Sequence, residues 1–142
     1  MRTLERLIRL DGEKCTNCQI CELSCSAFRE HGFSPRKARL HVERGDALEA
    51  SLRICNLCEP PACVVACPTH AVEVSDSLRL VSFAAEDCSA CGRCVHACPQ
   101  QALTLWREAK SPAVCDFCAD HPKCVENCPW GALVLEFHLG LE

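Results

Sequence analysis

The sequence predicts an α+β fold in which short strands and short helices are joined by long loops and arranged as two similar modules. Sixteen of the 142 residues are cysteines, and they fall into four groups of four. After three groups, a Cys-Pro pair is followed by an alanine and then alternating apolar residues, at 67–74, 98–105 and 128–135. Such recurrence indicates an internal repeat of one structural unit. We therefore expect two modules of two cysteine groups each, related by a pseudo-twofold axis.

Alternating apolar and polar residues predict the strands. A first strand is expected at 7–10. One hairpin is expected to pair 39–43 with 51–54 around Gly45-Asp46, and a second spans 72–81 with its turn at 75–77. Glycine, aspartate and serine favour turns at these positions. The apolar tail 133–141 is expected as a strand or as part of the core.

Short helices of one to three turns are expected over 18–30 and around Cys63, Cys94 and Cys124. In each group the fourth cysteine follows the third by one helical turn. Proline after that cysteine suits a helix start or chain reversal, where its missing N–H does no harm. The first group has Ser26 instead of proline, so we expect the turn after Cys25 to be less constrained.

The cysteine spacing predicts iron–sulfur clusters. The first and third groups read C-x2-C-x2-C-x3-C, and the other two have longer second spacers. Such spacers bring three sulfurs to one corner of a [4Fe–4S] cluster, and in two-cluster ferredoxins the fourth cysteine ligates the other cluster. Four groups predict four [4Fe–4S] clusters in ferredoxin-like modules. The candidate ligands are Cys15, Cys18, Cys21, Cys25, Cys55, Cys58, Cys63, Cys67, Cys88, Cys91, Cys94, Cys98, Cys115, Cys118, Cys124 and Cys128.

Two other uses of cysteine compete with this interpretation. Zinc sites usually have two C-x2-C knuckles with a longer spacer, unlike these crowded groups. Disulfides call for a secretory signal, whereas the first ten residues have neither an apolar region nor a small-residue cleavage site. We therefore expect a reduced, cytoplasmic chain. The sequence contains no run of about 18 apolar residues, so we expect no direct membrane span. The net charge of −4 argues against a nucleic-acid partner.

Residues 58–68 and 115–131 closely resemble the four-cluster ferredoxin-like subunits of molybdenum and tungsten oxidoreductases, such as those of dimethyl sulfoxide reductase and formate dehydrogenase. The opening at 15–39 is similar to the small subunits that accompany tungsten aldehyde:ferredoxin oxidoreductases and related benzoyl-CoA reductase systems. The resemblance covers nearly the whole chain.

The resemblance implies a nested pairing of the groups, first with fourth and second with third. The spacing supports the inner pair independently, because Cys67 and Cys88 lie about one hairpin apart. We expect a single domain over 1–142, with an outer module of 1–50 plus 107–142 and an inner module of 51–106. The implied ligand sets are Cys15, Cys18, Cys21 and Cys128; Cys115, Cys118, Cys124 and Cys25; Cys55, Cys58, Cys63 and Cys98; and Cys88, Cys91, Cys94 and Cys67.

The implied function is an electron-transfer subunit bound to a large catalytic subunit, a tungsten or molybdenum pterin enzyme such as an aldehyde oxidoreductase. The other redox partner would be a flavoprotein, a ferredoxin or a further copy of the chain. The alternatives are a free polyferredoxin shuttle and a zinc-stabilised scaffold. We expect no reaction of its own, because the sequence has no dinucleotide or phosphate loop and no Ser/His/Asp set. The tail at 133–141 could also dock on the catalytic subunit, which deletion of 136–142 would test.

Overall fold

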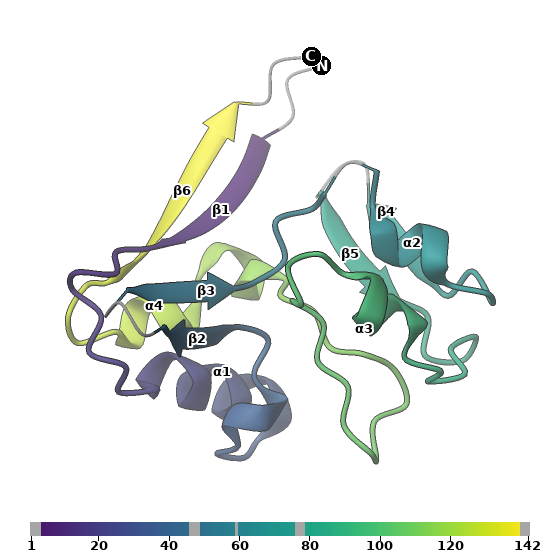
Figure 1. Ribbon diagram of the computed structural model, residues 1–142, viewed down its shortest axis with the longest axis horizontal. Helices are drawn as coiled ribbons and strands as arrows, with labels where there is room; N and C mark the ends of the chain where they lie inside the picture. The colour runs from purple at the N-terminus through teal and green to yellow at the C-terminus, as the bar shows by residue number, and fades with distance from the viewer. Residues whose placement is uncertain (1–3, 46–48, 59, 76–78, 140–142) are drawn as a thin grey trace.

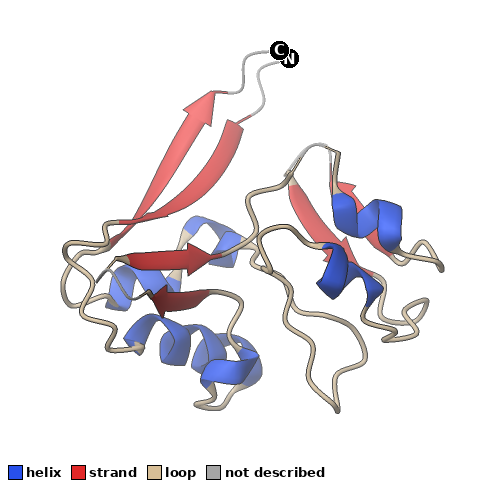
Figure 2. Cartoon of the chain, in the orientation of Figure 1, coloured by secondary structure: helices blue, strands red, loops and turns tan. Residues whose placement is uncertain are grey.

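The computed structural model describes residues 4–45, 49–58, 60–75 and 79–139. Its elements are short, and loops separate them, as Figure 2 shows. This confirms the predicted α+β, loop-rich class. In chain order the elements are β1 (Leu4–Leu10), α1 (Ile20–Glu30), the 3₁₀ turn η1 (Pro35–Lys37), β2 (His41–Arg44), β3 (Ala50–Arg53), α2 (Ala62–Ala66), β4 (Val72–Ser75), β5 (Leu80–Phe83), α3 (Arg93–Ala97), the 3₁₀ turn η2 (Phe117–Asp120), α4 (Lys123–Asn127) and β6 (Leu133–Leu139).

The described strands form three antiparallel pairs: β1 with β6, β2 with β3, and β4 with β5. In β4–β5, Val72 pairs with Phe83, so the predicted hairpin forms but extends two residues beyond the expected end at 81. Ser75, expected in the turn, belongs to β4, and 76–78 lie outside the described residues. The β2–β3 hairpin begins at His41, two residues later than predicted. The tail forms β6, whose Leu133 pairs with Leu10 of β1. The two ends of the described chain are thereby held together in one ribbon.

Figure 1 shows two lobes joined by extended chain. One lobe contains α1, α4, β2 and β3, and the β1–β6 ribbon projects from it; the other contains α2, α3, β4 and β5. Each lobe has its own hydrophobic cluster, one around Ile8, Leu40 and Leu133 and the other around Val72 and Val81. Two buried cysteines belong to each cluster: Cys25 and Cys124 to the first, and Cys63 and Cys94 to the second.

The segment after the second Cys-Pro pair, Cys98-Pro99, differs from the predicted repeat. Where an alternating strand was expected at 98–105, the described chain forms only an isolated bridge between Thr104 and Ala113. The Thr104 hydroxyl donates a 2.8 Å hydrogen bond to the Ala38 carbonyl, which belongs to the other lobe. This segment therefore connects the lobes instead of pairing within one hairpin.

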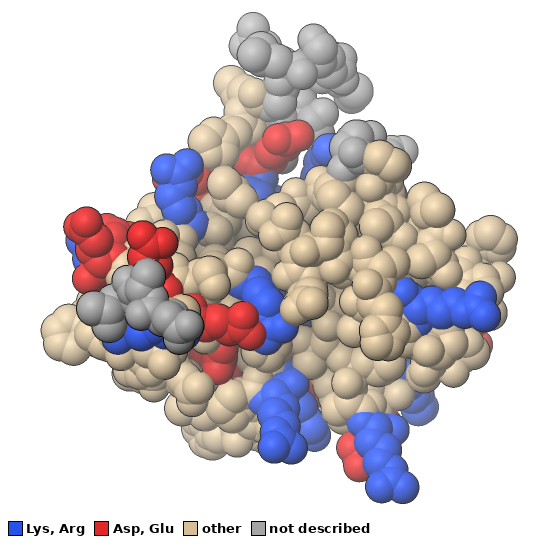
Figure 3. Space-filling model, in the orientation of Figure 1, with Lys and Arg blue, Asp and Glu red and all other residues tan. Residues whose placement is uncertain are grey.

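The described surface mixes charges of both signs. On the face in Figure 3, basic and acidic side chains lie in small groups around an area that carries no charge. No helix among the described residues is long and apolar enough to cross a membrane.

Candidate metal centres

The structure gathers cysteines from distant parts of the chain around common cavities. One cavity is lined by the first three cysteines of the first group and the last cysteine of the fourth, with Leu10, Val42 and Leu133 in its wall. We call these four residues the Cys128 tetrad: Cys15, Cys18, Cys21 and Cys128. The pairing of β1 with β6 brings the two ends of the chain close enough to form it.

Two more cavities in the second lobe have the same construction. Each is lined by three cysteines of one group and the fourth cysteine of the other. The helices α2 and α3 supply the buried Cys63 and Cys94. The Cys98 tetrad is Cys55, Cys58, Cys63 and Cys98, and the Cys67 tetrad is Cys67, Cys88, Cys91 and Cys94.

The remaining four cysteines also lie near one another. Burial raises the pKa of the Cys124 thiol, and the charges of Cys115, Cys25 and Cys118 raise it further. Cys25 is buried on α1, whereas Cys124 is buried on α4, which packs against α1. We call this set the Cys25 tetrad: Cys25, Cys115, Cys118 and Cys124.

The C-x2-C loops share a backbone conformation. In each group the residue two positions after the first cysteine has a positive φ; these residues are Asn17, Leu57, Ala90 and Phe117. The left-handed conformation reverses the chain and turns the N–H groups inward. The Ala90 N–H donates to the Cys88 sulfur at 3.4 Å, and the Phe117 N–H donates to the Cys115 sulfur at 3.5 Å. The loops thus provide hydrogen bonds as well as sulfur.

The repeated alanine after each Cys-Pro pair also faces a sulfur. Its N–H donates to the cysteine four residues earlier, at 3.3 Å from Ala71 and 3.4 Å from Ala102 and Ala132. All three alanines are at most 1% exposed. A larger side chain has no room there, which explains why alanine recurs. The sequence showed the repeat but gave no sign of this contact.

Cys25 departs from this pattern. Instead of ending in a turn, the chain continues through Cys25 as α1 to Glu30, because Ser26 has the N–H that proline lacks. Ser26 is fully buried, donates to the Leu23 carbonyl at 3.0 Å, and accepts the Ser34 N–H at 3.1 Å. The Arg39 N–H donates to the Cys25 sulfur at 3.2 Å, in place of the alanine. The predicted loosely constrained turn is therefore a helix held by a buried hydroxyl.

The thiol pKa values separate the cysteines into two types. Burial raises the pKa of Cys63 to about 11, and burial together with the Glu22 charge raises that of Cys21 to about 12. A hydrogen bond with the Thr69 hydroxyl lowers the pKa of Cys67. At Cys128, burial raises the pKa, but backbone N–H groups outweigh it and the net shift is downward. The N–H groups around Cys128 therefore favour the thiolate, which is the form that binds iron.

The donor set fits an iron–sulfur cluster. Among the described residues, no group of three or more His, Cys, Asp or Glu side chains is placed to hold a single metal ion. Three of the tetrads line cavities instead of converging on one point, and nearby N–H groups donate to sulfur. This suits a polynuclear cluster held by four thiolates.

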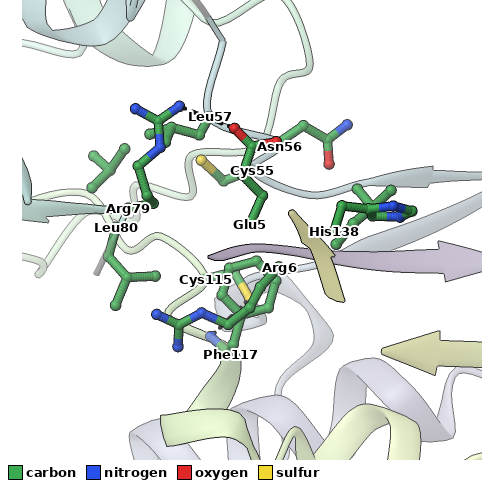
Figure 4. A pocket seen from close by; sticks show the side chains of 12 residues that line it. Glu5, Arg6, Cys55, Asn56, Leu57, Arg79, Leu80, Cys115, Phe117 and His138 are labelled. Atoms are coloured by element: carbon green, nitrogen blue, oxygen red, sulfur yellow. Dashed lines mark hydrogen bonds and ion pairs between the residues drawn. The ribbon is translucent and has the colours of Figure 1, made fainter. Parts of the chain in front are cut away.

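A larger cavity of about 250 Å³ lies between the lobes. Figure 4 shows Cys55 and Cys115 on different sides of it, and these belong to different tetrads. Arg79 lies 3.5 Å from a Glu5 oxygen across this space, and Arg6 pairs with Asp120 at 2.7 Å. The cavity therefore separates the Cys98 and Cys25 tetrads and contains no complete tetrad.

Comparison with known proteins identifies the family of the chain. Residues 54–103 and 80–129 match two family models, each described as a 4Fe-4S dicluster domain. The polyferredoxin-like subunit of aliphatic sulfonate oxidoreductase from Pyrococcus furiosus is 35% identical, over 85% of this chain and 70% of that protein. A tetrathionate reductase subunit of Salmonella typhimurium is 30% identical over 89% of this chain. The iron–sulfur subunit of the nitrate-inducible formate dehydrogenase of Escherichia coli is 28% identical over 87%.

The chain spans 55% of the tetrathionate reductase subunit and 51% of the formate dehydrogenase subunit. Among solved structures, the active site complex BamBC of benzoyl coenzyme A reductase, as isolated, contains a chain with the same fold. The TM-score is 0.57 at 21% identity, covering 100% of this chain and 82% of that one. Two dicluster matches and a ferredoxin-like fold define a protein of [4Fe–4S] clusters. The chain belongs to the family of iron–sulfur electron-transfer subunits of oxidoreductase complexes.

Proposed function

We propose that the chain holds four [4Fe–4S] clusters, one in each of the four tetrads, and relays electrons between a catalytic subunit and a second redox partner. The observation that carries the proposal is that three cavities are each lined by four cysteines, three from one group and one from its nested partner. We also propose that the chain is divided into an outer module of 1–50 plus 107–142 and an inner module of 51–106.

The clusters would supply one-electron redox chemistry when bound. The chain itself supplies the thiolates, partly excludes water from the sulfurs and donates N–H groups to them. Hydrogen bonds to sulfur and limited solvent exposure are the means by which a protein sets cluster potentials. We propose that the chain carries electrons and catalyses no reaction itself.

The proposed main partner is a large catalytic subunit, a tungsten or molybdenum pterin enzyme of the aldehyde oxidoreductase type, in the cytoplasm. The names of the relatives as subunits of sulfonate oxidoreductase, tetrathionate reductase and formate dehydrogenase support a catalytic partner in general. A flavoprotein, a ferredoxin or another copy would complete the route. Co-purification of the native chain with a large pterin-containing protein tests this, and isolation of the chain alone would favour a free shuttle.

Iron and acid-labile sulfide measure the cluster content. Anaerobically purified protein should contain about 16 of each per chain, from four clusters of four. Zinc without sulfide would overturn the electron-transfer proposal and support a zinc-stabilised scaffold. EPR spin quantification of the dithionite-reduced protein should count four clusters.

Two double variants test the nested pairing. Cys15→Ala with Cys128→Ala removes two ligands of one proposed cluster, so three clusters should remain unaltered by EPR. Cys15→Ala with Cys25→Ala removes one ligand from each of two clusters, so only two should remain unaltered. If each group instead held its own cluster, these results would be exchanged. The two variants are matched in the number and type of residues changed.

A further inference from the structure

The helix α1 presents opposite charges to two neighbouring tetrads. Cys21 and Cys25 lie one turn apart on its packed face, and they belong to the Cys128 and Cys25 tetrads respectively. Glu22 follows Cys21 directly, and Arg29 lies one turn beyond Cys25. One short helix therefore brings a carboxylate to one tetrad and a guanidinium to the other.

The acidic side is buried. Glu22 is 3% exposed, and its Oε1 accepts the Val42 N–H at 2.8 Å. The His41 Nδ1 lies 3.7 Å from the same oxygen. Glu22 is bonded directly to Cys21 on α1, so its buried carboxylate is held close to this ligand of the Cys128 tetrad. The carboxylate thus opposes negative charge on the Cys128 tetrad. The Arg44 guanidinium donates to the Cys15 carbonyl at 2.8 Å, but it is exposed and solvent screens its charge.

The basic side is formed by Arg29 and Arg39, whose side chains are mostly covered. The Arg39 N–H donates to the Cys25 sulfur at 3.2 Å. Both guanidiniums lie within ion-pair distance of Asp116, whose Oδ1 accepts the Cys118 N–H at 3.1 Å. Arg39 also donates to the Val114 carbonyl at 3.3 Å, which fixes its guanidinium near the tetrad.

Carboxylates partly offset these cations. Arg29 forms an ion pair with Asp116, which follows Cys115 directly in the ligand loop. Arg39 lies 4.0 Å from Asp116 and 3.9 Å from Glu30. Two guanidiniums and a backbone N–H nevertheless act on Cys25, so the arginines stabilise negative charge at this end of the tetrad.

We propose that Glu22, Arg29 and Arg39 create a step in reduction potential between neighbouring clusters, with the Cys25 tetrad higher than the Cys128 tetrad. The inference rests on the proposed cluster ligands. Reduction adds one electron and one negative charge, so a nearby carboxylate opposes it and a nearby guanidinium favours it. An electron on the Cys128 tetrad would pass spontaneously to the Cys25 tetrad with no proton or other reactant required.

The test is an EPR-monitored redox titration of the full, anaerobically purified chain with any co-purifying partner. Glu22→Gln should raise the potential of one cluster, and Arg39→Gln should lower that of a different one. We expect each change to alter the oxidised-to-reduced ratio about tenfold, equivalent to about 59 mV for one electron. Arg39→Lys retains the charge and the N–H and should titrate like the wild type.

Two exposed substitutions serve as matched controls. Glu108→Gln and Arg36→Gln make the same charge changes at exposed positions, where solvent screens them, and should shift neither component. In the wild type, the component that Arg39→Gln affects should have the higher potential. Reversed order, or the same component shifted by both variants, would overturn the step. Unchanged potentials in variants with about 16 iron atoms per chain would also overturn the step but leave the proposed function intact. A wild type with fewer than four clusters would overturn both the step and the proposed function.

Discussion

Each repeated alanine both fills a confined space and donates an N–H to a sulfur. Ala132 is 1% exposed, with its N–H 3.4 Å from the Cys128 sulfur. Gly131, immediately before it, has a φ of +61° and nothing within 4 Å of an added Cβ. His70 and Gln101 occupy the equivalent position in the other two repeats with similar positive φ. Adjacent residues in the same loop therefore differ greatly in their tolerance of substitution.

We predict that Ala132→Leu destabilises the chain by about 1–3 kcal/mol, because added volume in a packed site forces neighbours to move. Gly131→Asn should cost about 1 kcal/mol or less, since asparagine accepts the left-handed conformation and open space surrounds this position. The destabilisation in each variant is followed by the rate at which iron–sulfur absorbance is lost in denaturant. Equal bleaching rates for the two variants would contradict this account of the repeat.

At the scale of elements, α1 depends on Ser26. The hydroxyl is fully buried and links the helix to Ser34 in the following loop. We predict that Ser26→Pro, which would copy the other three groups, destabilises α1 by about 3 kcal/mol or more by breaking the helix. Ser26→Ala should cost less, about 1–3 kcal/mol, because it leaves the partly buried Ser34 N–H without its acceptor.

Circular dichroism and EPR can compare these two variants. Ser26→Pro should lose helical signal together with the cluster of the Cys25 tetrad, while Ser26→Ala should keep both. If Ser26→Pro retained full helix content and all clusters, the helical role of Ser26 would be wrong.

The sequence predicted most elements because cysteine spacing and alternation are local signals. The helices near Cys63, Cys94 and Cys124 and both hairpins follow from residues within about a dozen positions. Arg39 acts on Cys25 from fourteen residues away, through a backbone N–H that every residue except proline has. No residue type could have signalled that contact. Similarly, only the packing of α1 beside β2 shows that Glu22 is buried and bound to Val42.

At the scale of the whole molecule, thiols occupy places that larger apolar side chains fill in other small proteins. Cys25 and Cys124 belong to one hydrophobic cluster, and Cys63 and Cys94 belong to the other. When bound metal completes such a core, the binding free energy contributes to folding free energy.

We predict that iron extraction by an anaerobic chelator with a reductant abolishes cooperative unfolding and most strand and helix signal in circular dichroism. Reconstitution with iron and sulfide should restore both. A cluster-free chain that still unfolded cooperatively would show that the side chains alone stabilise the fold.

The closure of the chain by β1 and β6 has a consequence for synthesis on the ribosome. Leu10 cannot meet Leu133 until about 120 further residues have been translated, which takes roughly 6–25 s at ordinary rates. During that interval, Cys15, Cys18 and Cys21 remain exposed to oxidants and stray metals while the second lobe can already assemble. We therefore expect assembly in the cell to run from the middle of the polypeptide outward, so that the earliest thiols to be made are among the last to be protected.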